Sequence, residues 1–240
     1  MALDLSDARD LWQNKPVLRA IYHDYYRRMV DSCVPGRTLE IGGGSGNLKE
    51  FLPNVISTDV QTVPWLDVAA DAQALPFTDC SFDNIVMLDV LHHIERPVLF
   101  FNEAARVLRP GGRVVMVEPM ITPISWIFYN FFHPEPVDMH ADPLAGGELS
   151  PNRDPFDANQ AIPTRLFAGG GSRFEETFPD LHIISTKPLS LFAYPLSGGF
   201  RPWSVMPARL VPAVLNIEDV LLPLLGRAMA FRMMVCIERK

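Results

Sequence analysis

Residues 37–48 read Arg37-Thr38-Leu39-Glu40-Ile41-Gly42-Gly43-Gly44-Ser45-Gly46-Asn47-Leu48, and this stretch decides the fold. It predicts a short buried strand over residues 38–41, a glycine-rich turn over 42–46 and a helix from Asn47 onward. Glycine enters left-handed backbone conformations at little steric cost and lets a ligand approach the main chain. A helix N-terminus after such a turn directs free N–H groups at that ligand. The stretch therefore favours a nucleotide-like ligand over a plain tight turn.

Strands and helices alternate on both sides of this stretch. Further strands are predicted over residues 55–58, near residue 66, over 81–88 and over 113–119, and an amphipathic helix over 98–108. Residues 109–112 read as a turn. Residues 3–34 are predicted to be helical, with Pro16 in the first turn of a second helix. Alternating strands and helices indicate a parallel sheet with right-handed crossovers.

Length, composition and charge restrict the class of protein. The chain has 240 residues, of which 48% are apolar and 20% charged, as expected for one globular domain with an insertion. A formal net charge of −7 argues against a nucleic-acid binder. Cys33, Cys80 and Cys236 lie far apart and form no metal-type or redox-type pair. Without an apolar signal core or a long apolar run, we expect a cytoplasmic protein with no membrane span.

Five motifs occur in an order that resembles one known family. They are the glycine stretch at 39–46, Asp59, the segments 70–72 and 75–77, the strand 82–86 and the turn 108–112. Together they resemble the class I S-adenosylmethionine-dependent methyltransferases, most of all the small-molecule group with the quinone and sterol C-methyltransferases. The resemblance covers residues 35–118. It implies an α/β, Rossmann-like, doubly wound sheet of seven strands, mostly parallel with an antiparallel edge strand. The glycine spacing disfavours a nicotinamide (NAD)-dependent oxidoreductase, whose pattern is Gly-x-Gly-x-x-Gly.

The resemblance also implies which residues bind the cofactor S-adenosylmethionine. Glu40 and the backbone of the glycine turn would hold its methionine end, and Asp59 would bind the ribose. Asp71 would meet the adenine amino group beside the Ala72 backbone, and Leu88 would lie near the transferred methyl group. The full expected set is Glu40, Gly42, Gly43, Gly44, Gly46, Asp59, Val60, Asp71, Ala72 and Leu88.

The rest of the chain is expected to surround this core within one methyltransferase domain. Residues 1–34 would form N-terminal helices, 35–118 the cofactor-binding core, 119–180 a substrate or cap insertion, and 181–240 the C-terminal strands and helix. The last two strands are expected near 181–191 and 232–238. An apolar helix around 208–225 is expected to be buried, with contact to a lipid-like substrate or a membrane surface as the weaker alternative.

The segment after the fifth strand is where the resemblance places acceptor specificity. It opens with an aromatic cluster at 126–133, which suits an apolar or ring-shaped acceptor. Phe128, Phe131 and Phe132 fit a pocket wall and a helix core equally well. Residues 143–163 read as a long loop. The cluster His133, Asp138, His140 and Asp142 matches no established metal spacing, so no metal is expected.

Methyl transfer to an alcohol or phenol also removes a proton, a task that suits a histidine. The candidate bases are His93, which follows the fourth strand, and His133 and His140, with His92 as a further candidate. We expect methylation of a small molecule on oxygen first, with carbon or nitrogen as alternatives. A non-catalytic relative that kept the fold is the remaining alternative of a different class.

Overall fold

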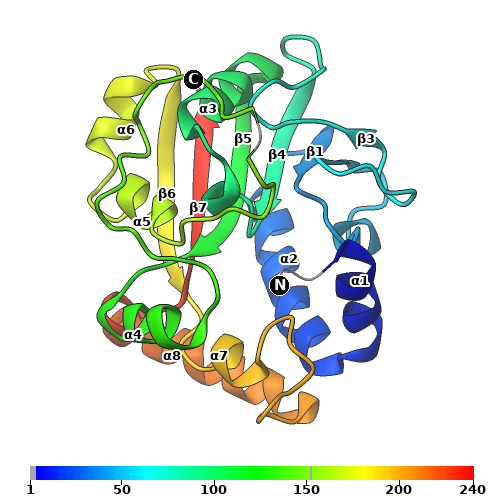
Figure 1. Ribbon diagram of the computed structural model, residues 1–240, viewed down its shortest axis with the longest axis vertical. Coiled ribbons are helices and arrows are strands. Elements are labelled where there is room, and N and C mark those ends of the chain that lie inside the picture. The colour runs from blue at the N-terminus through cyan, green and yellow to red at the C-terminus, as the bar shows by residue number, and fades with distance from the viewer. Residues whose placement is uncertain (1–3, 152) are drawn as a thin grey trace.

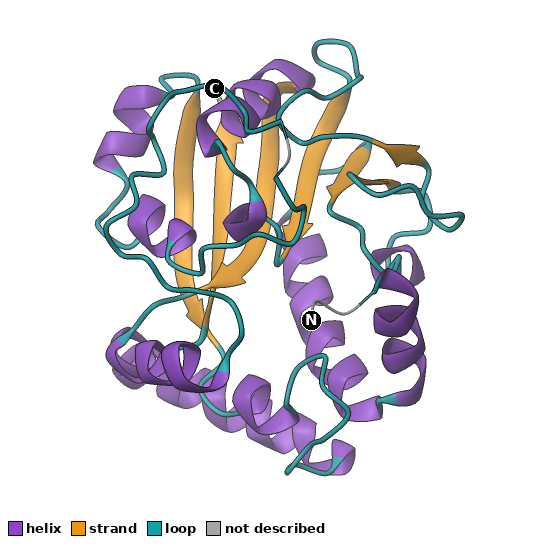
Figure 2. Ribbon diagram, in the orientation of Figure 1, coloured by secondary structure: helices purple, strands orange, loops and turns teal. Residues whose placement is uncertain are grey.

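A seven-stranded sheet forms the centre of the computed structural model, which describes residues 4–151 and 153–240 (Figure 2). Its strand order is β3-β2-β1-β4-β5-β7-β6. All neighbours pair in parallel except β7, which runs antiparallel to both β5 and β6. This confirms the expected doubly wound sheet, which is mostly parallel and has its antiparallel pairing at one edge. The strands are β1 Thr38–Ile41, β2 Ile56–Asp59, β3 Val68–Ala69, β4 Phe82–Leu88, β5 Leu108–Pro119, β6 Leu181–Leu189 and β7 Arg232–Arg239.

The helices flank the sheet and extend beyond one end of it (Figure 1). Local sequence signals account for several of their ends. Asp4 caps the first helix, Pro16 opens the second as expected, and Thr122 and Ser125 form a capping box at the fourth. The helices are α1 Leu5–Asn14, α2 Pro16–Ser32, α3 Pro97–Val107, α4 Pro123–Phe132, α5 Ile162–Phe167, α6 Ser172–Thr177, α7 Ala193–Ser197 and α8 Val211–Met229, with 3₁₀ turns η1 Asn47–Glu50, η2 Leu91–His93 and η3 Ala208–Leu210.

The core consists of two apolar layers, one on each face of the sheet. Alternate residues of β5 point to opposite faces. Val114 and Met116 join the cluster that includes α3, α5 and α6. Val115 and Val117 join the cluster built on α2. The central strands are thus buried on both sides, as their nearly continuous apolar sequences predict.

Two predicted boundaries near the core differ from the structure. The helix expected from Asn47 is a single 3₁₀ turn of 4 residues, because Pro53 follows closely and the chain turns into β2. A dipole from so short a helix contributes little, so the backbone groups of the glycine turn itself must supply the ligand contacts. The turn expected at 109–112 lies inside β5, where Leu108 pairs with Phe82 and a register shift before Asn84 absorbs the irregular geometry.

The expectation that the helix around 208–225 is buried was wrong. In α8 only Val211, Glu218 and Gly226 are buried. Val220 and Leu224 are 78% and 80% exposed. The reason is that α2 already covers the sheet face, so α8 packs there with one side only. In Figure 1, α4, α7 and α8 form a layer beneath the sheet.

Most of the large apolar side chains that are exposed in the described part of the chain lie in this layer. We call the following set the apolar face: Ile124, Trp126, Ile127, Phe131, Phe132, Leu196, Trp203, Val205, Leu210, Ile217, Val220 and Leu224. Of the three phenylalanines left open by the sequence, Phe131 and Phe132 are 71% and 63% exposed, whereas Phe128 is half-buried. Among the described residues, no helix has both the length and the hydropathy required to cross a membrane. The division of the chain into four segments stays a prediction.

Candidate functional site

One large cleft, of about 1630 Å³, brings most of the predicted site residues together. It extends from the glycine turn past the end of β4 to the segment after α4. Eleven residues expected to act in binding or catalysis line it: Gly42, Gly43, Gly44, Asp59, Val60, Asp71, Ala72, Leu88, His92, His93 and His133. Three others, Glu40, Gly46 and His140, are not part of this lining. The role of each in cofactor binding or catalysis stays a prediction.

The glycine turn exposes its backbone to the cleft. Gly42 and Gly44 have φ angles of +66° and +50°, in the left-handed region that favours glycine. The Gly43 N–H donates to the Thr58 carbonyl at 2.8 Å, which ties the turn to β2. A Cβ atom on Gly44 would have no neighbour closer than 3.9 Å, so a side chain there would extend into open space. The turn thus fits a ligand that lies against its main chain.

Asp59 ends β2 beside this turn. Its carboxylate accepts hydrogen bonds from the N–H groups of Gly44 and Gln61, each at 3.0 Å. A carboxylate has about four acceptor positions, so two remain for a pair of ligand hydroxyls. Asp71 accepts similarly from the Gln73 N–H at 2.8 Å on the same cleft wall.

Glu40 lies beneath the turn and not on the wall of the cleft. It is buried, and its Oε2 atom accepts a hydrogen bond from the Ser57 hydroxyl. A Cβ atom on Gly43 would lie 3.0 Å from the same oxygen, which places the carboxylate directly under the turn. Burial raises the pKa of Glu40 to about 7.

Glu40→Gln is expected to change the pH dependence of stability. Because the folded-state pKa of Glu40 lies above its unfolded value of 4.5, its contribution is full below pH 4.5 and is lost as the pH rises through 7. The loss amounts to about 3 kcal/mol. Denaturant unfolding at pH 5 and pH 8 should show this loss in the wild type and not in the variant. Identical pH profiles would contradict the buried, protonated state of Glu40.

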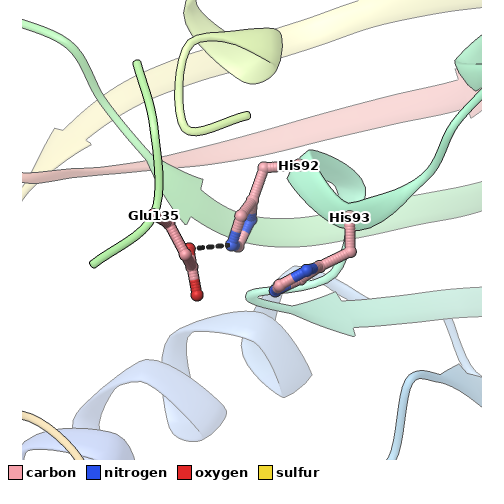
Figure 3. Close-up of side chains that lie close together, drawn as sticks. All are labelled: His92, His93 and Glu135. Carbon is pink, nitrogen blue, oxygen red and sulfur yellow. Dashed lines mark ion pairs between the residues drawn. The ribbon is translucent and has the colours of Figure 1, made fainter. Parts of the chain in front are cut away.

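A histidine held between two carboxylates lies beyond the end of β4. Figure 3 shows it with one of them, Glu135. The Nδ1 atom of His92 lies 2.8 Å from Oε2 of Glu118, and its Nε2 atom lies 3.4 Å from Oε2 of Glu135. Glu118 is fully buried at the end of β5, and its other oxygen accepts from the N–H groups of Val90 and Leu91. Sequence reasoning missed both glutamates, although the position of Glu118 at a strand end was a signal for it.

The charges of this cluster follow from its contacts. Burial alone would lower the pKa of His92, but its bonds to Glu118 and Glu135 raise it to about 10. Burial opposes ionisation of the two glutamates, yet the bond to His92 lowers the pKa of Glu118, and that of Glu135 to about 2. At neutral pH His92 therefore carries a proton on both ring nitrogens and cannot accept another.

His93 and His133 differ from His92 in this respect. Burial lowers the pKa of each to about 4, so both rings are neutral at pH 7. Both line the cleft, and the His93 ring lies 4.3 Å from that of His92. His140, the third candidate base, is exposed in the loop outside the cleft lining. The cluster with Asp138 and Asp142 is not formed: Asp142 instead pairs with Arg173.

A second ion pair that sequence reasoning missed joins the end of β4 to the start of β7, and both of its residues line the cleft. Asp89 follows β4 with a φ of +59° and pairs with Arg232 of β7. The Tyr22 hydroxyl donates to the same carboxylate at 3.0 Å. Tyr22 and Tyr26 are buried in the core on α2 and also line the cleft.

Comparison with known proteins agrees with this architecture. Residues 39–116 match the family model of the type 11 methyltransferase domain. A ubiquinone/menaquinone biosynthesis C-methyltransferase of a Ruegeria species is 45% identical over 107 residues, which are 35% of this chain and 43% of the relative. The 27-O-demethylrifamycin SV methyltransferase of Amycolatopsis mediterranei is 44% identical over 54 residues, 22% of this chain and 20% of the relative.

The chain spans about half or less of the length of the first curated relatives that it matches. Among solved structures, the [4+2]-cyclase SpnF has a TM-score of 0.51 at 17% identity, covering 92% of this chain and 81% of the cyclase. That likeness shows the fold alone. The motif order and the sheet topology agree with the domain match: residues 39–116 match a methyltransferase domain, and the whole sheet has the mostly parallel, seven-stranded arrangement expected from the resemblance.

Proposed function

We propose that this protein transfers the methyl group of S-adenosylmethionine to a hydroxyl group of a small, apolar acceptor. The observation that carries the proposal is the single cleft in which the glycine turn, Asp59 and two neutral histidines are all exposed. The sulfonium of the cofactor supplies an already activated methyl group, so correct positioning provides much of the rate.

The cofactor half of the cleft lies over the ends of β1 and β2. The turn at 42–44 would hold the methionine end, and Asp59 would accept from the ribose hydroxyls with its two unused acceptor positions. Asp71 and Ala72 line the wall where the resemblance places the adenine. Leu88 lies at the end of β4, between this half and the histidines.

The neutral histidines favour oxygen as the acceptor atom. A hydroxyl must lose its proton as the methyl group arrives, and a neutral imidazole can accept that proton. His93 is the first candidate because it directly follows β4 and lines the cleft, and His133 is the second. The relatives leave carbon open as the alternative acceptor atom, because one is described as a C-methyltransferase and another by a 27-O-demethyl substrate.

Aromatic and apolar side chains favour an apolar acceptor. Phe128, Phe132, Phe200 and Trp203 line the cleft. Phe132 and Trp203 also belong to the apolar face, so the cleft and that face share these two residues. A lipid-like acceptor could enter from this side with its apolar part against the face.

Gly44→Val is expected to abolish binding of S-adenosylmethionine at concentrations that saturate the wild type. The branched side chain would project into the open cleft, and its Cβ would strain a backbone with φ of +50° by about 1–2 kcal/mol. Titration calorimetry measures the affinity, and thermal unfolding confirms that the variant is folded. Gly111→Val is the matched control, because that glycine has a φ of +78° and open space around it but lies outside the cleft. Normal binding by Gly44→Val would mean that the ligand does not contact the turn.

Methyl transfer itself is tested with S-adenosylmethionine labelled on the methyl group. Acceptors would be alkyl-substituted phenols or quinols and the same compounds with the hydroxyl blocked. We expect label in the free hydroxyl compounds only, and a kcat lowered by roughly 10²–10⁴-fold in His93→Gln with unchanged cofactor affinity. His140→Gln, a histidine outside the cleft, should behave as the wild type. Transfer to the blocked compounds would move the assignment to carbon, and full activity of His93→Gln would remove its role as the base.

A further inference from the structure

We propose that His92, His93 and Glu135 bind one divalent transition-metal ion, of the Zn²⁺ class, at the acceptor end of the cleft. Each residue offers one ligand atom, and these atoms lie within 4.8 Å of one another. Figure 3 shows the two rings and the carboxylate directed toward a common space. The histidines come from η2 and the glutamate from the segment after α4, so the two walls of the cleft meet at this point.

The spacing of the ligand atoms suits such an ion. Zinc binds histidine nitrogen and carboxylate oxygen at about 2.0–2.2 Å in tetrahedral geometry, which separates neighbouring ligand atoms by about 3.3–3.6 Å. His92 Nε2 and Glu135 Oε2 are 3.4 Å apart. The third atom, from His93, lies within 4.8 Å of both, and its ring is partly exposed to the cleft.

Glu118 provides the support that metal-binding histidines usually have. It accepts from Nδ1 of His92 at 2.8 Å, and two backbone N–H groups fix its other oxygen. A carboxylate on the far nitrogen sets the tautomer and orientation of a ligating imidazole. Here it directs Nε2 of His92 toward Glu135 and the cleft.

Unpaired polar atoms next to the cluster give an independent sign of a missing partner. Gln160 is 2% exposed and donates to Oε2 of Glu135, yet its own Oε1 has no hydrogen-bond partner among the residues at 4–151 and 153–240. Nδ1 of His93 is likewise buried and unpaired within that part of the chain. Buried polar atoms are paired in the great majority of cases. The unpaired Nδ1 atom of His93, a member of the cluster, is therefore available to a ligand.

The chemistry of the three ligands indicates which ion would bind and what it would do in the reaction. Two imidazoles and one carboxylate suit Zn²⁺ or Co²⁺ better than Mg²⁺ or Ca²⁺, which prefer oxygen ligands. Three protein ligands leave a fourth position open toward the cleft. There the ion would bind the acceptor hydroxyl and favour its ionisation. When His93 is a ligand, the base role that the proposed function gives first to His93 would pass to its second candidate, His133, which also lines the cleft. This use rests on the proposed function, whereas binding of the ion does not.

Without a metal, protonated His92 forms ion pairs with Glu118 and Glu135, and binding of the ion would release the proton on its Nε2 atom. The alternative explanation is that the cluster forms this ion pair only and binds no metal. The two explanations differ in whether the protein binds zinc in a way that depends on Glu135 and His93. Glu135→Gln and His93→Gln each remove one ligand at the side of the cleft. His182→Gln is the matched control, because His182 and Glu175 form an exposed pair with 2.9 Å between Nδ1 and Oε1.

The experiment titrates chelator-treated protein with Zn²⁺ in competition with a chromophoric chelator, and with Co²⁺ followed by its visible absorption. We expect one ion per chain, an affinity at least 100-fold lower in Glu135→Gln and His93→Gln, and no change in His182→Gln. No saturable binding, equal binding by Glu135→Gln, or loss confined to His182→Gln would overturn the site. The same samples are also unfolded thermally with S-adenosylmethionine. A rise in Tm with S-adenosylmethionine but no zinc binding would overturn only the metal site. Zinc binding with no rise in Tm would overturn only the proposed function.

Discussion

Asp59→Ala is expected to weaken S-adenosylmethionine binding by roughly 10²–10⁴-fold. The carboxylate already accepts two backbone hydrogen bonds, and its two remaining positions face the cleft, where the ribose hydroxyls would donate. Hydrogen bonds to a charged group contribute about 1.5–3 kcal/mol each, so the loss of two amounts to about 3–6 kcal/mol. Each 1.4 kcal/mol corresponds to about a factor of ten in affinity. Titration calorimetry with S-adenosylhomocysteine, which does not turn over, measures the change.

Asp67→Ala is the matched control, which distinguishes the loss of a ligand contact from general damage to the β2 region. Like Asp59, Asp67 accepts a hydrogen bond from a backbone N–H, that of Ser57 at 2.8 Å, but it does not line the cleft. We expect this control to keep its cofactor affinity within a few-fold. Normal binding by Asp59→Ala, or equal losses in both variants, would contradict the ribose assignment.

Glu118→Ala is expected to lower the free energy of unfolding by about 3–5 kcal/mol. The substitution leaves the His92 imidazolium without its closest carboxylate and removes the acceptor of the Val90 and Leu91 N–H groups, all in a fully buried place. Removal of one partner from a buried ion pair has a cost of this size because the other charge remains buried. Denaturant unfolding at pH 7 with a chelator present measures it in the absence of any bound metal.

Glu238→Ala is the matched control for Glu118→Ala. Glu238 also belongs to an ion pair of the sheet, with Arg113 at 3.3 Å, but both side chains are partly exposed. Pairs of this kind contribute about 0–1 kcal/mol. A similar small loss in Glu118→Ala would show that the buried cluster does not hold the end of β4 in place.

The sheet was predictable from sequence because its signals are local. The observed bounds of β1 and β4 differ from the predicted ones by a residue or so, because Pro35-Gly36 and Gly42 bound β1 and a nearly continuous apolar run forms most of β4. The position of α8 was not predictable in the same way. Its apolar residues have helical periodicity, but periodicity does not reveal that α2 already occupies the sheet face that α8 would need.

The two halves of the site also differ in how far the sequence alone could predict them. The glycine turn and Asp59 lie within about one strand–turn–strand unit, so their spacing could be interpreted directly. The acceptor half depends on contacts between distant segments: Glu118 lies 26 residues from His92, and Arg232 lies 143 residues from Asp89. Sequence patterns select His93 and His133 as candidate bases, but only the fold shows that His92 is the histidine whose carboxylate contacts hold it protonated.

The most direct test of the central claim is thermal unfolding with S-adenosylmethionine, S-adenosylhomocysteine and NAD in separate samples. A ligand at about one hundred times its dissociation constant stabilises the folded state by about 2.7 kcal/mol, which is measurable as a rise in Tm. We predict a rise with the two sulfur compounds and none with NAD. A rise with NAD alone, or none with any of the three, would contradict a methyltransferase cofactor site at the glycine turn.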